Sequence, residues 1–219
     1  MPGNVPSSMA AHLPGALIDR AETLLASGGR ILGIAGPPGA GKSTLSEALA
    51  THFRDRAQLL PMDGFHLANE ELIRLGRNTR KGAPDTFDVD GYLSALQRVR
   101  AREHDVLVPR FHRQIEEPVA GAIRIAVDVD LVITDGNYLL LQQDRWSEVA
   151  QHLDESWMLR PNDAVRHERL VARHVVHGRT VEQAEAWVHT VDEPNAVLIG
   201  QLSAAADLVI TTDNFSYGA

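Results

Sequence analysis

The sequence lacks several features that would each point to a particular class of protein. It has no cysteine, which excludes disulfide bonds and thiolate metal sites. Acidic residues outnumber basic ones by 29 to 21, and the resulting net charge of -8 disfavours a general surface for nucleic acid or anionic membranes. No apolar run approaches the roughly 20 residues of a membrane span, and the first residues lack the charged start and apolar core of a signal peptide. We therefore expect a cytoplasmic protein that binds neither nucleic acid nor membranes.

The residues that are present fit one globular domain over residues 1–219, with a loose tail at 1–12. Hydrophobic residues make up 44% of the chain and charged residues 23%, an ordinary balance that allows a sizeable core. Short apolar segments alternate with segments of helical spacing. This alternation predicts an α/β fold with a mostly parallel sheet and helices on both faces, a three-layer sandwich.

One run of the sequence matches a phosphate-binding loop. Residues 36–43 read GPPGAGKS and fit the pattern G-x-x-x-x-G-K-[ST]. Glycines let the backbone N–H groups turn toward phosphate oxygens, while Lys42 can reach the terminal phosphates and Ser43 can bind magnesium. A predicted strand over 30–36 and a predicted helix over 43–53 give the motif the context it requires. We therefore predict a nucleoside triphosphate site made by Gly36, Pro37, Pro38, Gly39, Ala40, Gly41, Lys42, Ser43 and Thr44.

Two Asp-Gly pairs come at the ends of predicted strands. Asp63 follows the strand predicted over 57–62, and Asp135 follows the one predicted over 131–134. Ligands bind beyond the carboxyl ends of parallel strands. Asp63 is therefore a candidate base for an attacking hydroxyl, and Asp135 a candidate to orient magnesium with Ser43, directly or through water. Each pair could instead be an ordinary turn.

Two charged segments could hold an acceptor molecule. Residues 80–88, RKGAPDTFD, lie in a predicted functional loop over 64–89 and combine cations, acceptors and an aromatic ring; a solvated surface loop is the alternative. Arg113 and Glu116 lie in the second segment, which follows the strand predicted over 106–111 and precedes a turn predicted at 118–121 and an edge strand at 123–127. The candidate acceptor-binding residues are Asp63, His66, Arg80, Lys81, Asp85, Phe87, Tyr92, Arg110, His112 and Glu117.

The helix predicted over 163–177 carries Arg166, Arg169 and Arg173 on one face, spaced i, i+3 and i+7. Gly178 and Arg179 follow it. We interpret residues 163–200 as a small lid with helices beside the nucleotide, in which arginines stabilise the charge of the transferred group. The alternative is a solvated helix face.

The order of these segments resembles the phosphoribulokinase/uridine kinase/bacterial pantothenate kinase superfamily of P-loop kinases. The segments GPPGAGKS, PMDGFHL, RKGAPDTFD, LVITDGNYLL and RHVVHGRT cover about residues 30–213. Asp-Gly-Phe followed by Arg-Lys-Gly-x-Pro is most similar to pantothenate kinase. The compact length, EEPVAG and DEPNAVLI are more similar to small nucleoside kinase-like proteins labelled as sugar-transport-associated kinases.

The resemblance implies a P-loop NTPase fold and phosphorylation of a small-molecule acceptor with ATP and Mg²⁺. It implies Asp63 as the base, Lys42 and Ser43 at the phosphates and magnesium, and Arg173, with Arg179, in the lid. Many relatives have glutamate in the segment of Asp135, so direct or water-mediated contact with magnesium stays open. The acceptor (pantothenate, a nucleoside, a sugar or a sugar acid) and a homodimer also stay open.

A P-loop switch or metallochaperone that acts through a protein partner is the alternative function. Such switches usually read guanine through an Asn-Lys-x-Asp segment, and metal delivery favours Cys/His clusters. The sequence has neither.

Overall fold

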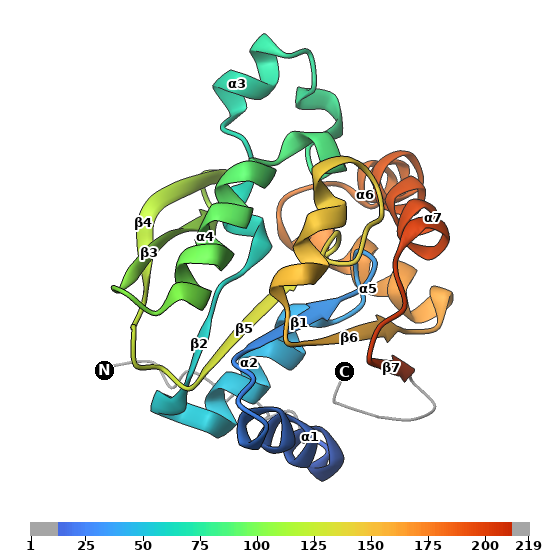
Figure 1. Cartoon of the computed structure of the whole chain (residues 1–219). Helices are drawn as coiled ribbons and strands as arrows, with labels where there is room; N and C mark the ends of the chain where they lie inside the picture. The colour runs from blue at the N-terminus through green and yellow to red at the C-terminus, as the bar shows by residue number, and fades with distance from the viewer. Residues whose placement is uncertain (1–12, 212–219) are drawn as a thin grey trace, which may run out of the picture.

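The computed structural model describes residues 13–211, so the tail predicted at 1–12 lies outside the described residues. Five strands form a parallel sheet in the order β2-β5-β1-β6-β7 (Figure 1). The strands of this sheet are β1 (Ile31–Ala35), β2 (Ala57–Leu59), β5 (Leu131–Gly136), β6 (Glu155–Arg160) and β7 (Leu208–Thr211). The α/β fold predicted from the alternating segments is confirmed.

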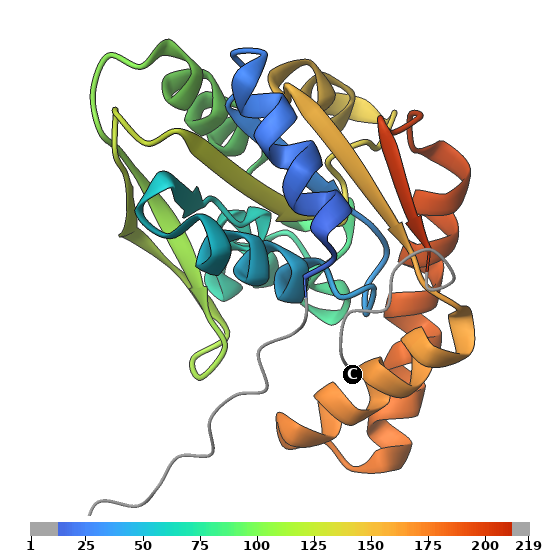
Figure 2. The same ribbon diagram turned by 90° about the horizontal axis from the view of Figure 1, so that it is seen from below.

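Helices cover both faces of the sheet, and each face has its own apolar core. The first face is covered by α1 (Gly15–Ala26) and α2 (Lys42–Phe53), which Figure 2 shows side by side, and the second by α4 (Val89–Ala101), the 3-10 helix η5 (Asp144–His152) and α7 (Glu193–Leu202). Leu17, Leu45 and Leu49 are buried on the first face. Tyr92 and Trp146 are buried on the second. This arrangement is the predicted three-layer sandwich.

Several helical segments follow β6, and the first corresponds to the helix predicted over 163–177. The first is α5 (Asp163–Val176); the others form one helical run made of α6 (Val181–Trp187), a π-helical turn (Val188–Asp192) and α7. Together, α5 and α6 project from the body of the protein (Figure 2). Among residues 13–211, every helix is too short or too polar to span a bilayer.

A separate antiparallel hairpin corrects two predictions. It consists of β3 (Val106–His112) and β4 (Glu117–Ile125), so the turn predicted at 118–121 is wrong, and the edge strand predicted at 123–127 begins at Glu117 and ends at Ile125. Pro118 is the second residue of β4, a strand with one free edge, where its missing N–H is tolerated. Gly121, with φ of 68°, lies where three residues of β4 oppose one residue of β3. Such a bulge accommodates a glycine that otherwise indicates a turn.

Asp63 lies in a short helical turn rather than directly after a strand. β2 ends at Leu59, and Met62–Phe65 form the 3-10 turn η2. A Cβ atom on Gly64 would lie 2.3 Å from the carbonyl oxygen of Pro109 on β3. The absence of a side chain at Gly64 therefore lets this turn pack directly on the hairpin. The loop predicted over 64–89 contains α3 (Asn69–Arg74) and the 3-10 turns η3 (Asn78–Arg80) and η4 (Pro84–Thr86).

We expect Gly64→Ala to lower the free energy of unfolding by about 1–3 kcal/mol, because the new methyl group would meet backbone atoms. Urea unfolding followed by circular dichroism measures this change. Gly200→Ala in α7 is the control: its Cβ would meet no atom within 4 Å, and alanine should stabilise the helix by up to about 1 kcal/mol. Equal stability of Gly64→Ala and the wild type would contradict the close approach.

Candidate active site

The phosphate loop connects β1 to α2, and its shape depends on glycine. Gly39 and Gly41 have φ of 78° and 89°, in the left-handed region that favours glycine. A Cβ on Gly39 would lie 2.8 Å from Leu170 and 2.9 Å from the carbonyl oxygen of Arg166. Helix α5 therefore packs directly on the loop. The free N–H groups at the start of α2 give the loop the positive end of a helix dipole.

Two hydrogen bonds position the Lys42 ammonium between the phosphate loop and the end of β5. Its Nζ donates to the carbonyl oxygen of Pro37 at 3.0 Å and to Oδ1 of Asn137 at 2.7 Å. Burial lowers the pKa of Lys42 to about 8, although the nearby carboxylates of Asp135 and Asp63 oppose this shift. The sequence analysis missed Asn137; its place directly after Asp135-Gly136 was the available signal.

Ser43 and Asp135 form the second pair at the loop. The Ser43 hydroxyl donates to Oδ2 of Asp135 at 2.8 Å. Burial raises the pKa of Asp135, which is 8% exposed, to about 6. One hydroxyl and one carboxylate suit Mg²⁺, which takes its remaining ligands from phosphates and water. Residues 13–211 hold no cluster of three or more His, Cys, Asp or Glu side chains that would bind a metal without such help.

Asp63 is half-exposed and surrounded by positive charge. Its Oδ2 accepts a hydrogen bond from Arg113 at 3.1 Å. Burial by itself would raise the pKa of Asp63, but neighbouring charges outweigh it and lower the pKa below its ordinary value. These charges belong to His66, Arg113, Lys42 and Arg173. The Asp63 carboxylate is therefore ionised at neutral pH and able to accept a proton.

One cavity joins these groups. It has a volume of about 530 Å³, and Ser43, Asp135 and Asp63 all line it. The hairpin contributes Arg110 and Phe111. A pocket of this size accommodates a small metabolite, so a candidate metal site and a candidate base face the same space.

Comparisons with known proteins identify the family. YggC of Escherichia coli, an uncharacterized protein, is 37% identical over 179 residues, which cover 80% of this chain and 74% of YggC. A Schizosaccharomyces pombe protein named "Putative uridine kinase" is 34% identical over 80% of this chain and 79% of its own length. The chain belongs to the phosphoribulokinase/uridine kinase/pantothenate kinase superfamily of P-loop kinases.

The solved structures agree with this family. A crystal structure from Silicibacter, described as a "putative fructose transport system kinase", matches with a TM-score of 0.77 and 35% identity over 83% of this chain and 90% of that one. No protein-family model matches the chain. P-loop kinases use ATP and Mg²⁺ in general.

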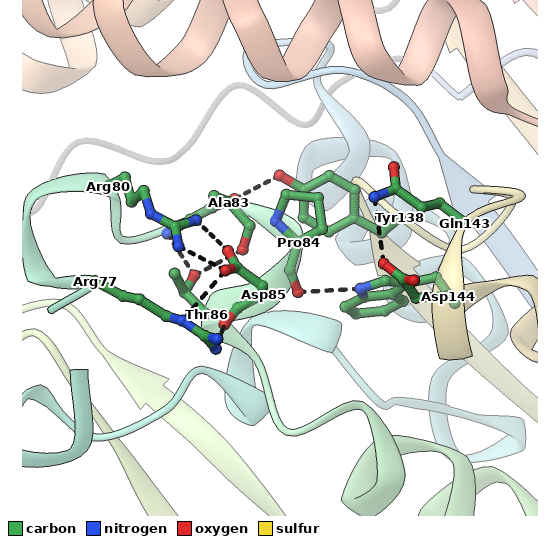
Figure 3. A network of polar contacts seen from close by, with 11 residues as sticks. Arg77, Arg80, Ala83, Pro84, Asp85, Thr86, Tyr138, Gln143 and Asp144 are labelled. Carbon is green, nitrogen blue, oxygen red and sulfur yellow. Dashed lines mark hydrogen bonds and ion pairs between the residues drawn. The ribbon is translucent and has the colours of Figure 1, made fainter. Parts of the chain in front are cut away.

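In this P-loop kinase, the charges of Arg80 and Asp85 are used within their own exposed loop. The Asp85 carboxylate binds Arg77 at 3.2 Å and Arg80 at 2.6 Å (Figure 3). The Tyr138 hydroxyl and the Trp146 indole hydrogen-bond to carbonyl groups of the same loop, at 2.5 and 3.0 Å. The structure brings Arg80 and Asp85 together as a loop brace, and neither lines the cavity.

Lys81 and Glu117 connect the same loop to the hairpin. The Lys81 ammonium donates to the Asn69 side chain at 2.6 Å and to the carbonyl oxygen of Glu116 at 2.5 Å. Both carboxylate oxygens of Glu117 accept from the backbone N–H of Asn69, at 3.0 and 3.1 Å. His112 lies opposite Glu117 in the hairpin. These hydrogen bonds therefore connect the loop over 64–89 to the hairpin.

Aromatic rings also pack between the loop and the hairpin, but Tyr92 is not among them. The ring of His66 lies 4.0 Å from that of Phe87 and 4.7 Å from that of Phe111, between centroids. Tyr92 is fully buried and its hydroxyl lies 2.5 Å from that of Thr134. The prediction that Tyr92 contacts the acceptor is wrong, because a core partner already satisfies its hydroxyl.

The three arginines of α5 do not act as one face. Arg166 is 2% exposed, and its Nη2 binds both carboxylate oxygens of Glu193 at 2.7 Å. Arg169 is half-exposed. Burial, and then the charge of Arg113, lower the pKa of Arg173, while the charges of Asp192 and Asp63 oppose this shift. Arg173 is thus the arginine of α5 whose charge interacts with that of Asp63, the candidate base.

Arg179, the other arginine predicted to act in the lid, contacts an aromatic ring instead of an acidic group. Its guanidinium lies 3.8 Å from the ring centroid of Trp187 on α6. Such a cation–π contact connects the end of α5 to α6. Whether Arg179 reaches the triphosphate stays a prediction.

The raised pKa of Asp135 predicts how stability depends on pH. The folded chain binds this proton more tightly than the unfolded chain, so stability falls as the pH rises from 3.8 to about 6. Asp135→Asn removes this loss and should raise the free energy of unfolding at pH 7 by up to about 3 kcal/mol. Urea unfolding between pH 4 and 8 measures the difference. The exposed Asp128→Asn variant should keep the wild-type pH dependence, and an Asp135→Asn curve parallel to the wild type would contradict the shift.

Proposed function

We propose that this P-loop kinase transfers the γ-phosphoryl group of ATP to a hydroxyl group of a small metabolite, with Asp63 as the general base. One observation carries the proposal: Ser43, Asp135 and Asp63 line a single cavity of about 530 Å³. The candidate metal ligands of the phosphate loop and a deprotonated carboxylate can then contact one bound molecule, as phosphoryl transfer requires.

Each group has a distinct role in the proposed reaction. Loop N–H groups and Lys42 bind the phosphates of ATP. Ser43 and Asp135 would hold Mg²⁺, which neutralises phosphate charge when bound. Asp63 accepts the proton of the acceptor hydroxyl, whose oxygen forms the new bond to the γ-phosphorus. The bond from that phosphorus to the bridging oxygen breaks, and its electron pair stays on ADP.

Arg173 supplies positive charge to the same reaction. Its charge interacts with that of Asp63, and it lies on α5, the helix that packs against Gly39 of the phosphate loop. An arginine in this place can stabilise the charge of the transferred phosphoryl group. We therefore assign residues 163–200 as the lid.

The names of the relatives suggest hydroxylated acceptors of the nucleoside and sugar type, and pantothenate-type acceptors stay in the same set. An assay of ADP release with pantothenate, nucleosides, sugars and sugar acids tests the function directly. Release that depends on an acceptor supports a kinase, whereas release that only a protein partner stimulates supports a P-loop switch. Location in the cytoplasm and a homodimer stay predictions.

Asp63→Asn should lower the rate of transfer by about 10²–10⁴-fold, the usual contribution of a general base. The loop contacts of ATP are unaffected, so the affinity for ATP, measured by calorimetry, should stay close to that of the wild type. Asp55→Asn, on the exposed turn before β2, is the matched control with full activity. Turnover of Asp63→Asn equal to that of the wild type would remove Asp63 as the base.

A further inference from the structure

The hairpin side of the cavity is rich in arginine. Arg110, Arg113 and Arg124 all line it, and they come from one short hairpin of a chain whose net charge is -8. The acidic groups of the cavity are Glu47, Asp63 and Asp135, which lie on α2, η2 and β5 and not on the hairpin. The hairpin therefore gives the cavity a basic side that has no role in binding ATP or Mg²⁺ in the proposed reaction.

The three guanidinium groups differ in their partners. Arg124 is paired with Asp105 at 2.6 Å, so its charge is already balanced. Arg113 binds Asp63 at 3.1 Å. The exposed side chain of Arg110 makes no hydrogen bond or ion pair with any residue of the range 13–211. One cation is thus free, and another is paired only with the proposed base.

The pair of Arg113 and Asp63 bears directly on the reaction. A guanidinium that donates to Oδ2 of the base holds an oxygen that must receive a proton, and lowers its basicity. An anionic group bound between Arg110 and Arg113 would offer the Arg113 guanidinium another oxygen and release Asp63. Guanidinium groups suit this role because their fork of donors matches both carboxylate and phosphate oxygens.

Apolar side chains also line the cavity beside the two arginines. Phe111 lies between them in sequence, and the Arg113 guanidinium lies 5.7 Å from the centre of its ring. Leu59, Pro61 and Ile123 also line the cavity. An acceptor with an anionic end, a short carbon body and a hydroxyl near Asp63 would use all of these surfaces.

We infer that the acceptor carries a carboxylate or phosphate group, and that Arg110 and Arg113 bind this group. The inference rests on the proposed kinase function and narrows its substrate class. A neutral nucleoside or sugar would leave the Arg110 side chain without a partner, and Arg113 would stay hydrogen-bonded to Asp63.

The test compares acceptors in matched pairs, with ADP release as the readout: glycerate with glycerol, pantothenate with panthenol, gluconate with glucose, and ribose 5-phosphate with ribose. We expect transfer only to anionic members, and the carboxylate and phosphate pairs separate the two chemistries.

Arg110→Gln should raise the KM of the anionic acceptor about 10–100-fold, since charged hydrogen bonds are lost, without changing the KM of ATP. Arg98→Gln, exposed on α4, should change neither. A neutral member used as well as its anionic partner would overturn the inference and leave the kinase function standing.

A binding measurement separates the two proposals. The anionic members alone should raise the midpoint of thermal unfolding of the wild type, and Arg110→Gln and Arg113→Gln should each abolish the shift. A shift of this kind without transfer to any acceptor would support the anion site and count against the kinase function. No shift and no transfer with the anionic members would overturn the inference.

The pH profile of Arg113→Gln is a further test, because a purely structural role of Arg113 would leave this profile unchanged. Removal of its charge should shift the acidic limb of the pH profile of kcat/KM upward, because Arg113 lowers the pKa of Asp63. An unshifted limb would contradict a contact between Arg113 and the working base.

Discussion

The parallel pairing of β1 with β5 is the constraint on which the site depends. Its register places Ile34 opposite Asp135 and Ala35 opposite Gly136. The phosphate loop and the segment from Asp135 to Asn137 therefore leave the sheet at the same edge, where Ser43 and Lys42 contact them. A slip of one residue would turn Asp135 to the other face of the sheet. Sheet register thus determines the chemistry at the loop.

Asp63, the proposed base, is positioned at the same cavity by contacts outside the parallel sheet. Gly64 allows η2 to pack against Pro109 of the hairpin, and the Glu117 carboxylate connects the hairpin to α3. Asp63 is consequently held between two connected elements, within reach of the charge of Arg113. The basic hairpin does two things in this account: it keeps Asp63 ionised and it offers a place for an anion.

Local patterns predicted the sheet, its helices and the phosphate loop, because each has a signal within a few residues. Long-range partners set the rest. Tyr92 was expected at the acceptor, but Thr134, distant in sequence, holds its hydroxyl in the core. The prediction that the three arginines of α5 share one face was wrong, because Arg166 is buried and paired with Glu193. Pro118 and Gly121 indicate a turn by themselves, and only pairing with β3 shows the bulged strand.

A crystal structure with Mg²⁺ and a non-hydrolysable ATP analogue is the most direct test of the central claim, that Asp63 and the γ-phosphate share one cavity. The account predicts that the γ-phosphate lies beside Ser43 and Lys42, with the Asp63 carboxylate facing it across an open space of one hydroxyl group. A γ-phosphate that points away from this cavity, or a side chain that fills the space between it and Asp63, would contradict the account.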